Sequence, residues 1–483
     1  MKKNFSEKIE LSKPNLNKAR KRIVESEIIK NAFVIPNNIK NIGINKKYHI
    51  RTYGCQSNVR DSENMKGMLE KVGYTWVENI LEADLVILNT CAIRENAEQK
   101  VFGEIGFLKQ LKKNNPNFIF GLTGCMPQEE KVVEKILNST DHVDFLMGTH
   151  NIYRLLIVLE QAIFEKQTIV EIWSKEGDVI ENMPSVRDSK IKAFVNVMYG
   201  CDHFCTYCIV PFTRGKIRSR TKEDILSEIN ELIKDGYKEV TLLGQNVNDY
   251  GIDLKDINYR FKNLLADVAK TNIERIRFTT SNPWNFSDDL IDVISKNKNI
   301  MPFFHLPIQS GDEEILKKMN RHMKIADYIA TIKTIREKIP SVAISTDLIV
   351  GFPNETDEQF KKTLELYNLI QYDNAYTFIF SPREGTVAAK MKDSIPMEVK
   401  EKRLQELNLL VKKYARKNNE KYVGKTYQIL VEGLSKNNHS MTTGYSPEWK
   451  VVNFKAKPKT KPGDIVNVKI DEAYGFSLLG TEK

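Results

Sequence analysis

Hydrophobic and polar positions alternate in a regular way from Tyr48 to about Phe380. Short runs rich in β-branched residues are each followed by a turn and then by apolar residues at helical spacing. This order is typical of βα units, which build parallel sheets with helices on their faces. We therefore predict an α/β protein over this part of the chain.

The first series of units is expected in residues 47–165. Its predicted strands lie at 48–53, 85–89, 118–122 and 143–147, each followed by a helical pattern. Residues 166–188 are mixed and polar and include Pro184, so we predict a linker there.

A second series, in residues 189–419, has predicted strands at 194–198, 240–243, 276–279, 303–307, 343–350 and 375–380. One helix between them has clear ends, since Thr221 precedes Asp224 in an acidic capping box and Gly236 follows the last apolar position. Six βα units are fewer than the roughly eight of a closed barrel. We predict a partial (β/α)6 barrel that is open along one side.

Both ends of the chain differ from this α/β body. A long charged helix is predicted at 397–419, after which alternation of period two returns at 427–431 and 466–470. Residues 420–483 should therefore form a small all-β barrel. Residues 1–46 are rich in Lys and Asn and should be a basic extension with at most one helix, near 16–30.

Charge is concentrated at the two ends. Residues 1–46 contain 11 Lys or Arg and four Glu, and residues 411–483 contain 14 Lys or Arg and seven Asp or Glu, while the whole chain has a net charge of +10. The body between them therefore carries a small net negative charge. Basic ends of this kind favour a polyanionic partner, although solvated lysines without a partner give the same composition.

The remaining composition excludes several classes. The longest apolar runs, such as residues 85–88, are far shorter than the roughly 20 residues of a spanning helix, and the N-terminus lacks the apolar core of a signal peptide. We therefore expect no membrane association and a cytoplasmic location. Six cysteines in such a chain are expected to be reduced and available for metal or redox chemistry.

Three cysteines, Cys55, Cys91 and Cys125, each follow the carboxyl end of a predicted strand. Because the carboxyl ends of parallel strands lie at one edge of a sheet, these thiols should meet at one point. Gly54 and Gly124 precede two of them and allow close approach of the backbone. The alternative is that they are small buried residues without a ligand.

The other three, Cys201, Cys205 and Cys208, have the spacing C-x3-C-x2-C at the end of a predicted strand. Three thiolates can hold an iron–sulfur cube and leave one iron free for another ligand. A zinc site would need a fourth ligand, for which His203 is the nearest candidate. Tyr207, directly before the last cysteine, has no role in a zinc knuckle.

The segment MYGCDHFCTYCIVPFTRG resembles the signature of radical S-adenosylmethionine (SAM) methylthiotransferases. Further segments resemble the MiaB family, namely TYGCQSN, NTCAIRENAEQKVFGEIG, LLGQNVNDYG, HLPIQSGD, STDLIVGFPNETDEQF and SPREGTVAAKM. The resemblance covers residues 47–483. It implies an N-terminal cluster domain at 47–165, a radical SAM core at 189–419 and a TRAM barrel at 420–483.

The resemblance also implies two 4Fe-4S clusters and SAM as cofactors. The cluster on Cys201, Cys205 and Cys208 would bind SAM and cleave it to a 5′-deoxyadenosyl radical, which takes hydrogen from C2 of an adenine. The auxiliary cluster on the other three cysteines would carry the sulfur, methylated by another SAM. The cofactors supply this chemistry, and the protein positions them and excludes water.

Further residues match the family motifs with weaker support. Those with a proposed contact to SAM or to the substrate are Tyr207, Gly244, Gln245, Asn246, His305, Gln309, Asp347, Gly351 and Arg383. A plain βα turn at Gly244–Asn246, a structural histidine at 305 and a solvated arginine at 383 remain alternatives.

The implied substrate is the anticodon stem-loop of a tRNA that carries N6-isopentenyladenosine. Basic residues expected to bind its phosphates, and two aromatic residues beside them, are Arg214, Lys216, Arg218, Arg220, Lys450, Lys455, Lys457, Lys459, Lys461, Trp449 and Phe454. Other implied partners are a low-potential electron donor of the flavodoxin or ferredoxin type and the iron–sulfur assembly machinery.

Two other functions fit the same residues. One keeps the chemistry but acts on threonylcarbamoyladenosine of tRNA or on an aspartate of a ribosomal protein. The other is a zinc-stabilised RNA-binding protein without catalysis. Metal content distinguishes this zinc protein from the radical SAM enzyme, because two iron–sulfur cubes would give about eight irons per chain with acid-labile sulfide.

Overall fold

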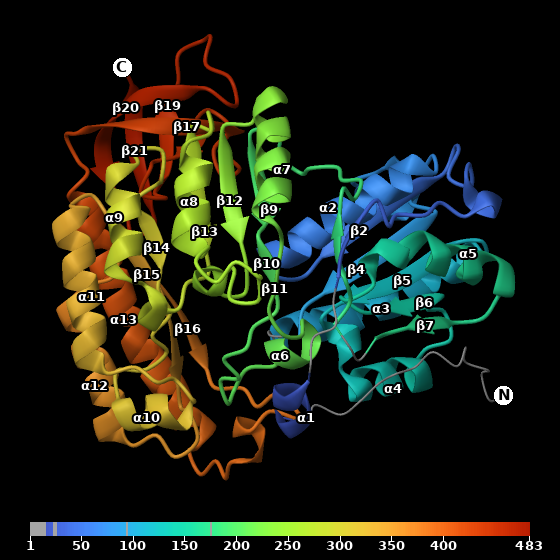
Figure 1. Ribbon diagram of the computed structural model, residues 1–483, viewed down its shortest axis with the longest axis horizontal. Helices are drawn as coiled ribbons and strands as arrows, with labels where there is room; N and C mark the ends of the chain where they lie inside the picture. Colours follow the sequence, from blue (N-terminus) through green and yellow to red (C-terminus); the bar gives the residue numbers. More distant parts are fainter. Residues whose placement is uncertain (1–15, 23–26, 93–94, 174–175) are drawn as a thin grey trace. The chain divides into compact units, whose positions relative to one another are not determined.

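The computed structural model describes residues 16–22, 27–92, 95–173 and 176–483 (Figure 1). The chain divides into two compact units, each built from separate stretches. The first contains Met1–Asp188, Met198–Arg220 and Pro382–Ala389, and the second contains Ser189–Val197, Thr221–Ser381 and Lys390–Lys483. The loop that carries Cys201, Cys205 and Cys208 thus belongs to the first unit, together with the other three cysteines.

A six-stranded parallel sheet forms the centre of the first unit. Its strand order is β3-β2-β4-β5-β6-β7. The strands are β2 (Lys47–Thr52), β3 (Thr75–Trp76), β4 (Leu85–Thr90), β5 (Ile119–Gly124), β6 (Phe145–Met147) and β7 (Ile169–Glu171). Four of the six were predicted within a few residues, because their β-branched runs are buried between two helix layers.

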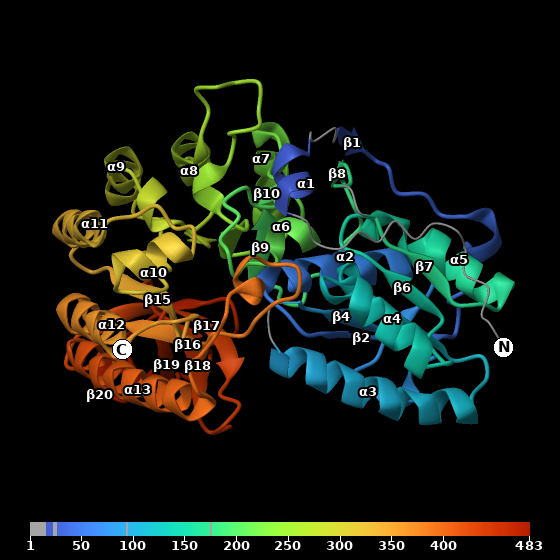
Figure 2. The same cartoon turned by 90° about the horizontal axis from the view of Figure 1, so that it is seen from below.

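Helices cover both faces of this sheet. They are α2 (Gln56–Lys71), α3 (Glu95–Asn114), α4 (Glu130–Ser139) and α5 (Leu155–Glu165). Alternate residues of the strands enter two separate cores: Ile87 packs with α2 and α5, whereas Leu88 packs with α3 and α4. Figure 2 shows α2 and α3 on opposite sides of the strands. The unit is therefore a doubly wound α/β domain.

The ends of this unit differ from two expectations. The predicted helix at 16–30 is shorter, since α1 spans Leu16–Lys21, and Ile28–Lys30 instead forms strand β1. Residues 166–188, predicted to be a linker, contribute β7 to the sheet, and their strand β8 (Val179–Glu181) pairs with β1 in parallel. Such short strands carry too little pattern to be recognised before their neighbours are known. Residues 1–15 and 23–26 lie outside the described part of the extension.

Six parallel strands form the barrel of the second unit. They are β9 (Lys192–Asn196), β12 (Glu239–Leu243), β13 (Arg275–Thr279), β14 (Phe303–His305), β15 (Ala343–Val350) and β16 (Asn374–Ile379). Two three-stranded sheets, β9-β12-β13 and β14-β15-β16, are joined by a bridge from Ile276 to Ile300. In the part of the chain that the structure describes, β9 and β16 each pair on one side only, so the barrel is open, as predicted.

The helices of this unit lie outside the strands. They are α7 (Lys222–Lys234), α8 (Phe261–Ala269), α9 (Asp288–Lys296), α10 (Glu313–Lys318), α11 (Ile325–Lys338), α12 (Asp357–Ile370) and α13 (Met397–Glu420). Thr221 is the N-cap of α7, as predicted: its hydroxyl accepts a hydrogen bond from the Asp224 amide at 3.2 Å and donates to the Asp224 carboxylate at 2.6 Å. The chain leaves α7 at Gly236, whose φ is +86°.

A closed five-stranded barrel follows α13. Its strands are β17 (Thr426–Leu434), β18 (Thr442–Tyr445), β19 (Val451–Lys455), β20 (Ile465–Ala473) and β21 (Ser477–Glu482). Its core contains Ile429, Val431, Val468 and Ile470, which are the apolar positions of the period-two pattern. Closure leaves no unpaired strand edge, which explains how so small a barrel is stable.

Arg277 joins this small barrel to the α/β barrel. Its Nε donates to Glu239 at 2.8 Å, and its Nη1 and Nη2 donate to the carbonyls of Pro447 and Ser446 at 2.8 and 2.9 Å. The Trp449 ring lies 4.3 Å from the guanidinium carbon. A buried arginine with a carboxylate, two carbonyls and an aromatic ring as partners fixes the two barrels to each other.

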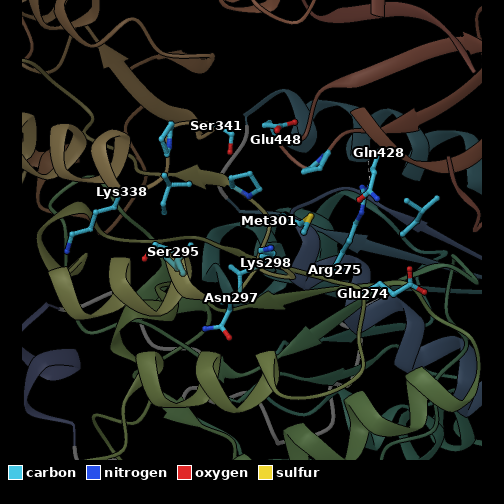
Figure 3. Close-up of a pocket in the computed structure, with 17 residues that line it drawn as sticks. Glu274, Arg275, Ser295, Asn297, Lys298, Met301, Lys338, Ser341, Gln428 and Glu448 are labelled. Carbon is cyan, nitrogen blue, oxygen red and sulfur yellow. Dashed lines mark hydrogen bonds between the residues drawn. The ribbon is translucent and has the colours of Figure 1, made fainter. Parts of the chain in front are cut away.

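A pocket of about 740 Å³ lies beside this joint (Figure 3). Arg275 and Glu448 line it, with residues that precede β13, β14 and β15. These positions are the amino ends of the strands, whereas the predicted cofactor residues of this unit lie in the carboxyl-terminal halves of the strands or in the turns that follow them. The pocket is therefore separate from the candidate site. Within the described residues, no helix has the length and apolar character needed to cross a bilayer.

Candidate active site

The first three cysteines lie at the carboxyl ends of three neighbouring strands. Cys55 is the N-cap residue of α2 after β2, Cys91 directly follows β4 and Cys125 directly follows β5. Cys91 and Cys125 are each 3% exposed, while Cys55 is half-buried. The structure thus gathers these thiols at one edge of the sheet, as their positions in the sequence predicted.

Polar contacts hold this edge together. The Cys125 amide donates to the Thr90 carbonyl at 2.8 Å across β5 and β4. A Cβ on Gly124, whose φ is +102°, would lie 2.3 Å from the same carbonyl oxygen, so only glycine fits there. Asn58 donates to Asn89 at 3.0 Å and lies 3.4 Å from the Cys55 sulfur, which ties the start of α2 to β4.

Burial dominates the electrostatics of Cys125. The pKa of this thiol is raised to about 12, because burial and, to a lesser extent, the nearby Cys91 and Cys55 raise it more than the Arg214 charge lowers it. A metal centre bound by Cys125 would have to displace this proton, since the thiolate is the ligand. An iron–sulfur cube takes one thiolate at each of its separate irons, so its ligands need not be close enough to share one ion. Within the described residues, no group of three His, Cys, Asp or Glu side chains is close enough to bind one single metal ion.

The second cysteine set lies in a loop closed by two short strands. β10 (Met198–Tyr199) and β11 (Arg218–Ser219) pair antiparallel on either side of it. The Cys201 amide donates to the Gly215 carbonyl at 3.0 Å, and the Cys208 amide donates to the Cys205 carbonyl at 2.9 Å. All three thiols are half-buried. Tyr207 lies in the same loop and is also half-buried.

Direct contacts bring the two cysteine sets close to each other. Ile209, the residue after Cys208, packs with Cys125 and Ala92 in one buried cluster. The Thr149 hydroxyl donates to the Thr213 carbonyl at 2.5 Å. The first unit therefore holds both sets of thiols next to each other, which the sequence pattern did not reveal.

Arg383 also belongs to this unit. It lies in the stretch Pro382–Ala389, separate in sequence from the rest of the unit. The amide of Ala388 donates to the carbonyl of Thr206 at 2.8 Å, which attaches this stretch to the cysteine loop.

The basic residues after the cysteine loop were wrongly predicted to line an RNA-binding rim. Arg214, Arg218 and Arg220 are buried. Arg214 pairs with Asp61 at 2.8 Å, and Arg220 pairs with Glu181 at 2.5 Å. Arg218 donates to the Gly177 carbonyl. These guanidinium groups hold the loop to the sheet domain, and only Lys216 is partly exposed.

The aromatic residues expected beside the basic loop of the last domain also lie elsewhere. Phe454 is fully buried in the core of the small barrel, and Trp449 packs on Arg277. Lys450 is buried and pairs with Asp373 at 2.8 Å. The four other lysines of this loop, Lys455, Lys457, Lys459 and Lys461, are exposed. The small barrel therefore offers lysines to a polyanion, without those two rings.

In the second unit, His305 and Asp347 face each other across β14 and β15. His305 Nε2 lies 3.3 Å from an Asp347 oxygen, and its Nδ1 lies 2.8 Å from the Ser345 hydroxyl. The Tyr376 ring of β16 lies 5.9 Å from His305 and is 53% exposed. Tyr376 was not among the predicted site residues. The alternation of side chains along β16 could have found it, because the neighbouring Thr377 faces the helix side of the sheet, where its hydroxyl donates to Asn408 of α13 at 2.7 Å, and Tyr376 therefore points to the other side.

The remaining predicted residues occupy turns at the carboxyl ends of the strands. The Gly244 amide donates to the Thr279 carbonyl at 3.3 Å, and Asn246 accepts a hydrogen bond from the Asn282 amide at 2.9 Å. Gln309 has a φ of +79° and donates its amide to the Asp347 carbonyl. Gly351 has a φ of +68°, and a Cβ there would lie 2.5 Å from Lys400. Gln245 lies between Gly244 and Asn246 in the first of these turns and is half-buried.

Three family models match successive parts of the chain. They are "Uncharacterized protein family UPF0004" over residues 47–148, the Radical SAM superfamily over residues 195–367 and the TRAM domain over residues 420–482. Their order agrees with the sheet domain, the open barrel and the small closed barrel.

Curated relatives are similar over nearly the whole chain. One from Malacoplasma penetrans is 61% identical over 98% of this chain and 97% of its own length. Another, from Bacillus cereus, is 54% identical over 97% of this chain and 92% of its own. Both are named tRNA-2-methylthio-N(6)-dimethylallyladenosine synthase. The chain belongs to the MiaB family.

As a MiaB-family protein, the chain is a radical SAM enzyme of the methylthiotransferase type, and its superfamily uses a 4Fe-4S cluster and SAM. A solved radical SAM methyltransferase from Kitasatospora setae, TsrM with cobalamin and a [4Fe-4S] cluster bound, has a TM-score of 0.51 to this chain. The match covers 71% of this chain and 77% of the other at 12% identity. At this identity, the similarity shows the common fold alone.

Proposed function

We propose that this MiaB-family enzyme adds a methylthio group to C2 of N6-isopentenyladenosine, next to the anticodon of tRNA. The observation that carries the proposal is the full-length identity of 61% to a relative named for this product. Two neighbouring sets of three thiols in one unit support it, because sulfur transfer and hydrogen removal need two separate reactive centres.

The cysteines divide these tasks. Cys201, Cys205 and Cys208 would hold the cluster that binds SAM, and Cys55, Cys91 and Cys125 would hold a second cluster. When bound, the clusters and SAM supply the electron, the radical and the sulfur. The chain holds the thiolates in place, and Ile209, next to Cys208, packs against Cys125 in a buried apolar cluster.

Other residues would bind SAM and orient the substrate. We assign this role to Tyr207, Gly244, Gln245, Asn246, His305, Gln309, Asp347, Gly351 and Arg383. The His305–Asp347 contact supports it, because a histidine fixed by a carboxylate presents one defined ring orientation to the barrel interior. A flavodoxin- or ferredoxin-type donor would supply electrons, the iron–sulfur assembly machinery would load the clusters, and the enzyme would act in the cytoplasm.

Mass spectrometry of tRNA nucleosides tests the substrate. Deleting the gene for this chain should remove 2-methylthio-N6-isopentenyladenosine and leave N6-isopentenyladenosine in its place. Restoring the gene should restore the methylthio nucleoside. Loss of a methylthio group from threonylcarbamoyladenosine, or from a ribosomal protein, would instead identify one of the alternative substrates and contradict the proposal.

The exposed lysines of the small barrel should contribute to tRNA binding. We expect the triple substitution Lys455→Gln, Lys459→Gln and Lys461→Gln to weaken tRNA binding. It should also reduce the slope of a plot of the logarithm of the tRNA binding constant against the logarithm of the salt concentration, by roughly one for each lost phosphate contact. Filter binding or fluorescence anisotropy at several salt concentrations measures both. A control with Lys361→Gln, Lys402→Gln and Lys412→Gln, exposed on α12 and α13, has the same change in charge. Equal slopes in the two variants would show that only net charge matters.

A further inference from the structure

The N-terminal extension lies outside the family motifs, yet its described residues contact the loop that carries the second cysteine set. Figures 1 and 2 both show α1 next to α6 (Val210–Thr213), a short helix of this loop. Arg22, directly after α1, donates from Nη1 to Glu176 at 2.7 Å, and the two side chains are 21% and 3% exposed. The same Glu176 oxygen accepts a hydrogen bond from the Lys216 amide at 2.9 Å. One buried carboxylate therefore joins the extension to the cysteine loop.

Two further contacts connect the extension to this loop. The Lys216 ammonium group donates to the Arg22 carbonyl at 3.1 Å. The Arg20 guanidinium carbon lies 5.7 Å from the centre of the Phe204 ring, a distance at which a cation and an aromatic ring attract each other. Phe204 directly precedes Cys205 and has a φ of +48°, which a bulky residue keeps only when its surroundings hold it. The extension thus contacts the loop directly beside one of its thiols.

Residues 176–181 contact both the extension and the cysteine loop. Their strand β8 pairs in parallel with β1 of the extension. The Gly177 carbonyl accepts a hydrogen bond from Arg218, and Glu181 pairs with Arg220 at 2.5 Å. Both arginines lie at the end of the cysteine loop, in and directly after β11. The extension, residues 176–181 and the loop therefore form one continuous network of polar contacts within the first unit.

We propose that Arg22 of the extension is a positioning residue for the cluster on Cys201, Cys205 and Cys208. Acting through Glu176, it holds the loop in the conformation that receives this cluster. Metal ligands keep a precise geometry only when the groups behind them are themselves fixed by hydrogen bonds. Part of the positive charge of the extension therefore has its partner within the chain and not in a polyanion. The inference rests on the proposed function, because that function places the SAM-binding cluster on these three cysteines.

Hydrogen exchange in the full-length, metal-free chain tests the contact itself. In Arg22→Gln, the amides of Cys201 and Lys216 should exchange roughly tenfold faster, because a hydrogen bond between charged groups is lost. Arg22→Lys keeps the positive charge and should restore part of the protection. Lys21→Gln is the matched control, since this neighbouring residue is exposed on α1 and the change in charge is the same. Equal exchange in Arg22→Gln and in this control would overturn the inference.

Iron retention in the enzyme loaded with both clusters tests the consequence. A chelator should remove the SAM-responsive cluster roughly tenfold faster or more from Arg22→Gln, and the auxiliary cluster at an unchanged rate. EPR spectra with and without SAM distinguish the two clusters, and Arg22→Lys should slow the loss again. Equally faster loss of both clusters would overturn the inference, since the effect would then be a general loss of stability.

Binding of tRNA separates this role from that of an RNA-binding tail. Arg22→Gln and Lys21→Gln should bind tRNA with equal affinity. Weaker tRNA binding in Arg22→Gln alone, with unchanged cluster retention, would overturn the inference and assign the extension to RNA. If the SAM-responsive signal persists in Cys201→Ala, the proposed cluster ligands are wrong. That is a separate failure, because hydrogen exchange in the metal-free chain still reports the contact between Arg22 and the loop.

Discussion

Replacing Cys201 by alanine is expected to reduce both SAM cleavage and methylthio product to background, whereas Cys55→Ala should remove only the product. The physical reason is that each thiol belongs to a different set of three. Loss of one thiolate leaves a cube with two protein ligands, which is too few to hold it in place. The other set keeps its own three ligands and its own loop contacts.

Three measurements check this expectation. Chromatography of 5′-deoxyadenosine reports SAM cleavage, nucleoside mass spectrometry reports product, and iron analysis should give about four irons per chain in each variant. The unsubstituted enzyme should contain about eight irons with acid-labile sulfide. Equal loss of SAM cleavage in Cys201→Ala and Cys55→Ala would mean that the roles of the two sets are wrongly assigned. Zinc without iron would end the proposal of an enzyme with these cofactors.

The second large effect concerns stability. Replacing Arg277 by methionine should destabilise the joint between the α/β barrel and the small barrel by about 3–5 kcal/mol, the usual cost of leaving a buried ion-pair partner alone. Glu239, whose side chain is 3% exposed, would lose its ion pair with Arg277. The carbonyls of Ser446 and Pro447 would each also lose the hydrogen bond that Arg277 donates.

Hydrogen exchange measures this joint locally. Amides of β18 and β19 should exchange at least a hundredfold faster in Arg277→Met, given about 1.4 kcal/mol for each factor of ten. Adding Glu239→Gln should restore part of the protection, because it removes the charge that has lost its ion pair. The control is Lys238→Met, which breaks an exposed pair with Glu274 and should cost below about 1 kcal/mol. If Arg277→Met behaves like this control, the joint does not depend on Arg277.

Much of the fold could be predicted from the chain because its signals are local. Period-two and period-3.6 patterns located most strands of both units and the capped helix α7. Position after a strand placed Cys55, Cys91 and Cys125 at one edge, since all carboxyl ends of a parallel sheet lie on the same side. Short elements such as β7 and β8 escaped, because three residues carry no period of their own.

Only the tertiary structure decided the partners of the charged and aromatic side chains. Arg214 looked like an exposed RNA contact, but it finds Asp61, 153 residues away in the sequence. Trp449 looked like a stacking platform, yet it packs on Arg277. The cysteine loop after β9 belongs to the unit of the other cysteines and not to that of the barrel strand before it. A local pattern determines which face of an element is apolar, whereas the partner of a guanidinium or a ring depends on long-range packing.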